Sequence, residues 1–239
     1  MKHTFYIILV ILIGSQTNCK EKIIESNNKK SLLNEYKNSF NNQEEFEPNK
    51  ELNLTIQQII KLYNSKNQKV INKYIHPNLG LNILFRRGTV DEWSNESELC
   101  LLSECYKKSN IPYWFKDELK DQKVTYNDTI KETENPIFIE CDSISNKGTF
   151  IVNTSNSKYL LSETMKRYIK SHSYDKTFFS KEKLKELNLE ILNVYKWEEN
   201  TRRIVVASSP ENSLTFYLTK IEGLWFLSTI DFITFDCSV

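Results

Sequence analysis

Two apolar runs joined by a Glu-Gly dipeptide constrain the fold of this chain more than any other feature. Residues 213–221 and 224–235 alternate apolar and polar side chains, as strands with one buried face do, and Gly223 supplies the backbone freedom that a two-residue turn needs. Two shorter apolar runs, 191–197 and 202–208, precede them. We therefore predict that all four runs are strands of a C-terminal antiparallel meander.

Two helices are predicted to open the folded part. Thr55 and Gln58 have the spacing of a capping box, and apolar residues then recur at every third or fourth position up to Tyr63. A second short helix is predicted from about Asn67, and it ends before Pro77 because proline disfavours helical geometry in the residue before it.

The remaining elements are predicted from weaker patterns. A strand is expected at 80–87, a hairpin of 137–144 with 148–154, and helices at 162–171 and 180–189, the last capped by Ser180. The stretch 88–135 is polar and poorly periodic, and its only helical pieces are expected at 97–107 and 116–130.

These patterns predict an α+β fold with a simple domain organisation. Residues 1–18 form a removable leader, 19–50 a polar flexible tether, and 51–239 one globular domain with an irregular insert at 88–135. Helices are expected to pack on a curved antiparallel sheet. The helix pair at 56–75 and the hairpin at 214–231 resemble the NTF2-like and cystatin-like folds, a resemblance that implies a conical pocket between helices and sheet.

The N-terminus has the layout of a secretory signal peptide. Lys2 is followed by an apolar run at 5–13 and then by small and polar residues up to Cys19. Nine apolar residues form a helix of about 14 Å, too short for a hydrocarbon core of about 30 Å. The segment resembles that of bacterial lipoproteins, with Gln16 and Asn18 making the lipobox degenerate. This resemblance implies a lipid on Cys19. Cleavage without lipidation and an uncleaved anchor are the alternatives.

The other cysteines are even in number, as expected for an exported chain that forms disulfides. We expect Cys141 to pair with Cys237, and Cys100 to pair with Cys105 across an irregular turn, because an i,i+5 pair in one continuous helix lies beyond disulfide reach. No metal site is predicted, since the three histidines do not cluster with these cysteines.

Composition excludes several classes of function. The chain has 32 basic and 31 acidic residues, so no basic field for nucleic acid is expected. Only five glycines are present, and none are spaced for a phosphate-binding loop or a nucleophile elbow. We predict no cofactor.

Three ionisable residues are weak catalytic candidates, namely His76, Asp91 and Asp231. A carboxylate buried in a pocket gains proton affinity and can act as a general base beside a histidine. However, a histidine before a proline more often caps or packs, and a carboxylate on a strand is more often solvated or anchors a turn. These structural roles are commoner than catalysis.

Two further groups are candidates for binding a ligand or a partner. Arg86 and Arg87 can hold a carboxylate or phosphate as a fork, although neutralisation of nearby acidic residues is the favoured role. Tyr113, Trp114 and Phe115 give the insert an aromatic loop that either folds onto the core or docks a partner.

Together these observations predict a lipid-anchored protein of the bacterial cell envelope with a non-catalytic binding domain. Its partners would be the membrane, through the lipid, and an unknown protein or small ligand. A small hydrolase or isomerase that uses His76 and Asp231 as acid and base is the alternative, and a purely structural envelope module is a third possibility.

Overall fold

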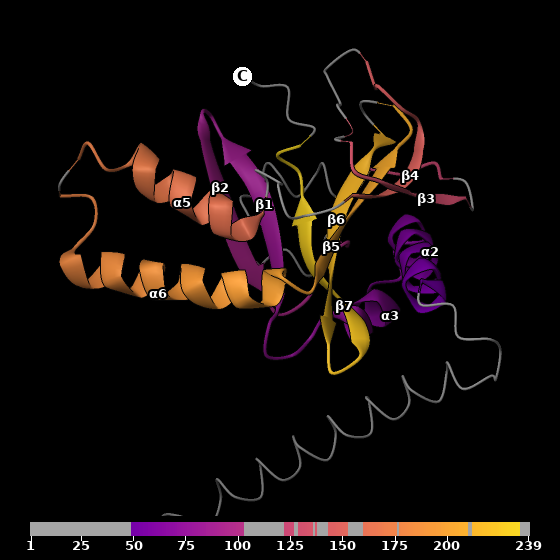
Figure 1. Cartoon of the computed structure of the whole chain (residues 1–239), viewed down its shortest axis with the longest axis horizontal. Coiled ribbons are helices and arrows are strands. Elements are labelled where there is room, and N and C mark those ends of the chain that lie inside the picture. Colours follow the sequence, from indigo (N-terminus) through magenta and orange to yellow (C-terminus); the bar gives the residue numbers. More distant parts are fainter. Residues whose placement is uncertain are drawn as a thin grey trace, which may run out of the picture. The chain divides into compact units, whose positions relative to one another are not determined.

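The structure is a computed structural model of the whole chain. It describes residues 49–102, 122–126, 129–135, 137, 143–152, 160–175, 177–209 and 212–234. All of these belong to one compact unit, Glu47–Val239. They form helices and a seven-stranded mixed sheet, so the predicted α+β class is confirmed (Figure 1).

Along the chain, two helical segments are followed by four strands, a helical hairpin and a three-strand meander. The helices are α2 (Lys50–Asn64), α3 (Gln68–Ile71), the 3-10 helix η1 (Asn72–Tyr74), α5 (Leu161–Ser171) and α6 (Lys181–Glu198). The strands are β1 (Leu81–Arg87), β2 (Val90–Glu96), β3 (Ile130–Thr133), β4 (Gly148–Val152), β5 (Thr201–Ala207), β6 (Leu214–Ile221) and β7 (Leu224–Asp231).

The strands are ordered β2-β1-β7-β6-β5-β4-β3 across the sheet. The β1–β7 and β3–β4 pairs are parallel and the other pairs are antiparallel. The predicted β6–β7 hairpin is confirmed. Its turn residues, Glu222 and Gly223, both have positive φ, at 51° and 86°, which matches the right-handed twist of the strands.

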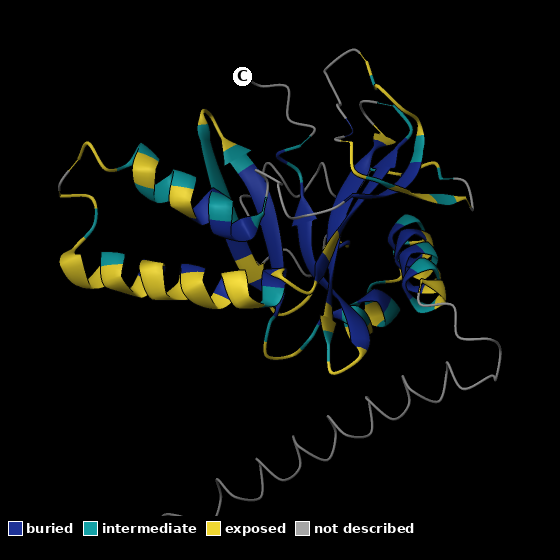
Figure 2. Cartoon of the chain, in the orientation of Figure 1, coloured by how far each residue is buried: buried dark blue, intermediate teal, exposed yellow. Residues whose placement is uncertain are grey.

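The two faces of the sheet carry different helices (Figure 1). Ile83 and Leu84, neighbours on β1, point to opposite faces. Ile83 lies in the main core cluster with Ile59 of α2, whereas Leu84 lies in a second cluster with Met165 of α5 and Ile191 of α6. Figure 2 shows the central strands buried and α6 exposed along most of its length.

The predicted helix pair at the start of the domain is present, with one correction. The first helix begins at Lys50, so Thr55 lies inside it and is not its cap. The Thr55 hydroxyl donates instead to the carbonyl of Glu51, one turn earlier, at 2.9 Å. The second helix begins directly after Asn67, close to the expected start, and the Asn67 side chain caps it by accepting the backbone N–H of Val70.

Four other predictions of local structure were wrong. Residues 191–197 form the second half of α6 and not a strand. The region 88–135 is not an irregular insert throughout, since it contains β2 and β3. Residues 97–102 and 122–126 are not helical. Strand β4 pairs with β3 on one side and with β5 on the other, so it does not pair with residues 137–144 in the predicted hairpin of 137–144 with 148–154.

Candidate functional site

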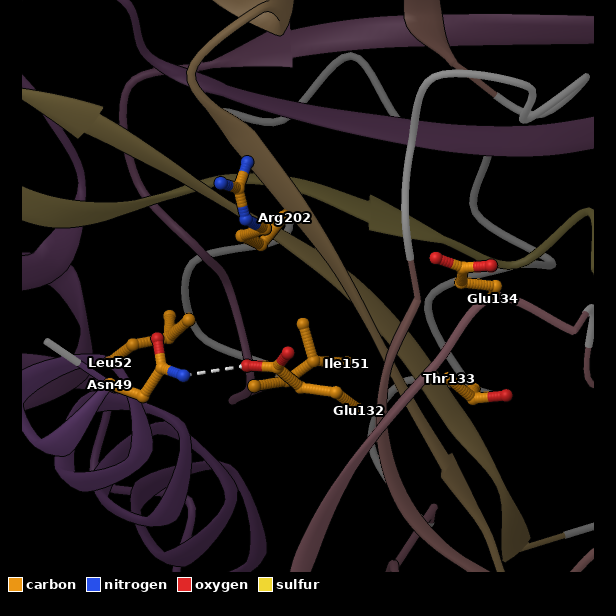
Figure 3. A pocket seen from close by; sticks show the side chains of 7 residues that line it. All are labelled: Asn49, Leu52, Glu132, Thr133, Glu134, Ile151 and Arg202. Carbon is orange, nitrogen blue, oxygen red and sulfur yellow. Dashed lines mark hydrogen bonds between the residues drawn. The ribbon is translucent and has the colours of Figure 1, made fainter.

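A polar pocket lies where the first helix meets strands β3 to β5 (Figure 3). Its volume is about 510 Å³, which falls within the ~300–1,000 Å³ typical of small-molecule sites. The residues that line it are Asn49, Leu52, Glu132, Thr133, Glu134, Ile151 and Arg202. Segments that are far apart in the sequence therefore build one pocket.

The pocket combines an apolar base with polar, charged walls. Leu52 and Ile151 are buried members of the main core cluster. Two exposed glutamates stand on the β3 side, and the exposed Arg202 comes from the start of β5. The side-chain amide of Asn49 donates to Oε1 of Glu132 at 2.7 Å and so links the start of α2 to β3. One guanidinium and two carboxylates can hold a small ligand that carries both charges.

Asp231, one of the three catalytic candidates from the sequence, lies in a sealed hydrogen-bonded network at the end of β7. Its side chain is fully buried. Oδ1 accepts the backbone N–H groups of Ile233 at 2.9 Å and Thr234 at 3.1 Å, and Oδ2 accepts the Thr234 hydroxyl at 2.6 Å. Nη2 of the buried Arg203 lies 4.0 Å from Oδ2. The carboxylate therefore anchors the turn that follows the strand.

Burial raises the pKa of Asp231 above its usual value, because removing the carboxylate from water disfavours its charge. The Arg203 guanidinium and the hydrogen bonds from Thr234 and Ile233 oppose this rise. The group is buried beneath the surface and has no exposed surface at which a substrate can reach it.

His76 and Asp231 are not brought together. The His76 ring packs edge-on against Phe226, with centroids 5.0 Å apart, and its Nδ1 accepts the backbone N–H of Asn78 at 3.3 Å. Phe226 is five residues from Asp231 along β7, which corresponds to about 17 Å. An acid–base pair made of these two residues therefore has no geometric basis.

The remaining charged candidates are held in ion pairs. Asp91 lies between Arg86, at 2.8 Å, and Arg167 of α5, at 3.0 Å. Arg87 lies 3.4 Å from Glu92. The arginines thus neutralise neighbouring carboxylates, which is the role that the sequence favoured over an anion-binding fork.

Several predicted residues lie outside the described part of the chain. They are Cys19, Cys105, Cys141, Cys237, Tyr113, Trp114 and Phe115. Cys100 is described and is buried. Both disulfide pairings, the lipidation of Cys19 and the aromatic docking loop therefore stay predictions.

Sequence reasoning expected a pocket between helices and sheet but named none of the residues that line this one. Asn49 fell in the predicted tether, and Glu132 fell in the predicted irregular insert. Neither segment carries a local motif, because the pocket exists only through the parallel pairing of β3 with β4 and the contact of β3 with α2. The one available signal was the pair Arg202 and Arg203 at the start of an otherwise apolar strand run.

The described residues contain no cluster of three or more side chains suited to hold a metal ion. Within the same residues, no helix has the length and apolar character needed to cross a membrane.

No protein-family model matches the chain, and neither a curated protein nor a solved structure matches it. The site is therefore interpreted from its own geometry.

Proposed function

We propose that this chain is a lipid-anchored, non-catalytic binding protein of the bacterial cell envelope, and that the pocket beside α2 holds a small ligand with both a positive and a negative group. The observation that carries the proposal is the charge arrangement of the pocket. Arg202 offers a guanidinium for a carboxylate, while Glu132 and Glu134 offer acceptors for an ammonium group. Free amino acids and short peptides have this chemistry.

Other features support a binding role over catalysis. In the described residues, the candidate acid–base groups serve structural purposes: Asp231 anchors a turn and His76 packs on Phe226. Five of the seven residues that line the pocket are polar or charged, which suits a polar, charged ligand.

Calorimetric titration of the chain with a panel of free amino acids and dipeptides tests the ligand class. We expect saturable binding that weakens at least about tenfold in Arg202→Gln and in Glu134→Gln, since each variant removes one charge. Glu134→Gln also keeps the side-chain length. Lys131→Gln, a neighbouring change outside the pocket, is the matched control. The proposal fails if no probe binds, or if both pocket variants bind as the unmodified chain does.

The lipid anchor is proposed from the first nineteen residues. A diacyl group and an amide-linked chain on Cys19 would hold the protein firmly, because two acyl chains suffice where one is marginal. Metabolic palmitate labelling tests this directly. Label should appear on the unmodified chain and disappear in Cys19→Ser, whereas a cleaved chain without label would indicate a secreted protein.

We also propose that the domain is a variant of the NTF2-like or cystatin-like folds. What supports this is the helix pair that precedes the sheet and a pocket between α2 and strands β3 to β5. The helices α5 and α6 on the other face would be an addition to that plan. A crystal structure with a flat sheet under α2, rather than a curved one, would contradict the assignment.

A further inference from the structure

Exposed apolar side chains concentrate on the α5–α6 hairpin. Seven large apolar side chains are exposed in the described part of the chain, and five of them lie between residues 174 and 195. These five are Tyr174 (84%), Phe178 (47%), Leu189 (60%), Leu192 (60%) and Tyr195 (53%). Isolated exposed apolar residues are ordinary, but five on one helical hairpin indicate a contact surface.

The helix α6 has apolar residues on two opposite sides. Leu187, Ile191 and Val194 are buried against the rest of the domain. On the opposite side, an exposed seam runs along positions three and four residues apart, the spacing of a coiled-coil stripe. The seam consists of Glu182, Lys185, Leu189, Leu192, Lys196 and Glu199, all of them exposed.

The order of residues in this seam is symmetric. From either end it runs glutamate, lysine, leucine, leucine, lysine, glutamate. Its centre lies between Leu189 and Leu192, near the middle of α6. A twofold axis at that point would place the seam of one molecule on an identical seam running in the opposite direction, as an isologous interface requires.

We infer that a second copy of this chain binds here, with the two α6 helices packed antiparallel. Leu189 then lies opposite the partner's Leu192, so four leucines form an apolar centre. At each end this axis sets Glu182 across from the partner's Glu199 and Lys185 across from the partner's Lys196. The opposite charges, Glu182 with the partner's Lys196 and Lys185 with the partner's Glu199, are offset by one helical turn and meet diagonally. Antiparallel packing also places the positive end of each helix dipole beside the negative end of the other.

The charge of the seam favours a second copy of the chain over a lipid surface as its binding partner. The seam contains two lysines and two glutamates, so it is neutral overall. Helices that lie on anionic membranes have a polar face rich in lysine and arginine, which this seam lacks. In the antiparallel pair, by contrast, each end holds two lysines and two glutamates that neutralise one another.

The size of the surface predicts a weak dimer. Eighteen residues form a helix about 27 Å long and about 10 Å wide. Its footprint, on the order of 270 Å², is well below the ~800 Å² per partner of a standard interface. Tyr174 and Phe178, at the tip of the hairpin, would extend the contact toward the far end of the partner's α6. Attachment to a membrane would favour such a dimer by raising the local concentration.

Sedimentation of the detergent-extracted full chain tests the dimer and is independent of ligand binding in the pocket. We expect a reversible monomer–dimer equilibrium with a dissociation constant of up to about 100 µM. Leu192→Lys should raise that constant at least about tenfold. Leu54→Lys, an exposed leucine on α2, is the matched control and should leave the equilibrium unchanged. Thermal unfolding of each variant checks that the fold is intact.

A charge-reversal series and photo-crosslinking test the geometry. Changing Lys185 and Lys196 to Glu should break the dimer, and adding Glu182→Lys with Glu199→Lys should restore it. A photoreactive phenylalanine in place of Tyr195 should crosslink, in a mixture of light and isotopically heavy chains, near residue 186 of the other copy. A monomeric chain, a dimer that Leu192→Lys leaves intact, or crosslinks to lipid or to another protein would each overturn the inference.

Discussion

Removal of the Asp231 carboxylate should destabilise the fold without touching the pocket. In Asp231→Ala, the backbone N–H groups of Ile233 and Thr234 and the hydroxyl of Thr234 lose their acceptor. Each hydrogen bond of this kind contributes about 1 kcal/mol net, so three correspond to about 3 kcal/mol. For a domain of this size, 1 kcal/mol shifts the melting temperature by about 2–4 °C, and we expect a fall of about 6–12 °C.

The pH dependence of this effect follows from burial. Because burial raises the pKa of Asp231, the native state binds the proton more tightly than the unfolded state does. The stability that the group contributes is therefore fully present below the unfolded pKa and falls as the pH rises through the folded pKa. The difference in free energy of unfolding between the unmodified chain and Asp231→Ala should be widest in acid and should narrow toward neutral pH.

Urea unfolding followed by tryptophan fluorescence, from about pH 4 to about pH 8, measures the difference in free energy of unfolding, and a thermal melt measures the fall in melting temperature. Asp231→Asn is the control, because it keeps an oxygen that can accept the two backbone N–H groups and should lose less stability than Asp231→Ala. The reasoning is refuted if Asp231→Ala unfolds at or above the temperature of the unmodified chain. A carboxylate strained for a functional purpose, rather than a structural anchor, would give that result.

Three further predictions concern local features of the fold. Burial raises the pKa of Glu198, whose Oε1 accepts the N–H of Ser162, so Glu198→Gln should gain stability relative to the unmodified chain as the pH rises from acid to neutral, measured by urea midpoints. Gly80 and Gly88 both have positive φ, but only at Gly80 would a Cβ meet Asn95, at 2.7 Å. Gly88→Ala should cost about 1–2 kcal/mol in a thermal melt and Gly80→Ala distinctly more; equal losses would contradict this. Ser180→Ala should lower the free energy of unfolding by about 1 kcal/mol, because the Ser180 hydroxyl accepts the N–H of Lys183. An unchanged melting temperature would show that this cap does not stabilise the fold.

Features that depend on short-range chemistry were predictable from the sequence. The Glu222–Gly223 turn requires two residues that tolerate positive φ, and the Ser180 cap requires a hydroxyl before a helix. Both are local properties of a few residues. The helix start at Lys50 was missed because Thr55 and Gln58 imitate a capping box, whereas the buried Thr55 in fact bonds within its own helix.

Features that depend on distant pairing were not predictable. Strand β3 has only four residues, and Ile130 and Thr133 at its ends are only half-buried. Its existence depends on pairing with a parallel neighbour, β4, and fourteen residues separate the end of β3 from the start of β4. The pocket inherits this limit, since Glu132 reaches its place only when β3 has paired.

The error over residues 191–197 explains why the seam on α6 was also missed. Ile191, Val194 and Trp197 are β-branched or aromatic and favour a strand by propensity, but their spacing of three places them on one side of a helix. If the segment were a strand, Leu192 would belong to a sheet. In the helix, Leu192 lies across from that buried side and is 60% exposed. When the segment is assigned a helical period instead of the strand period of two, residues predicted for a sheet become part of the surface on which we expect a second copy to bind.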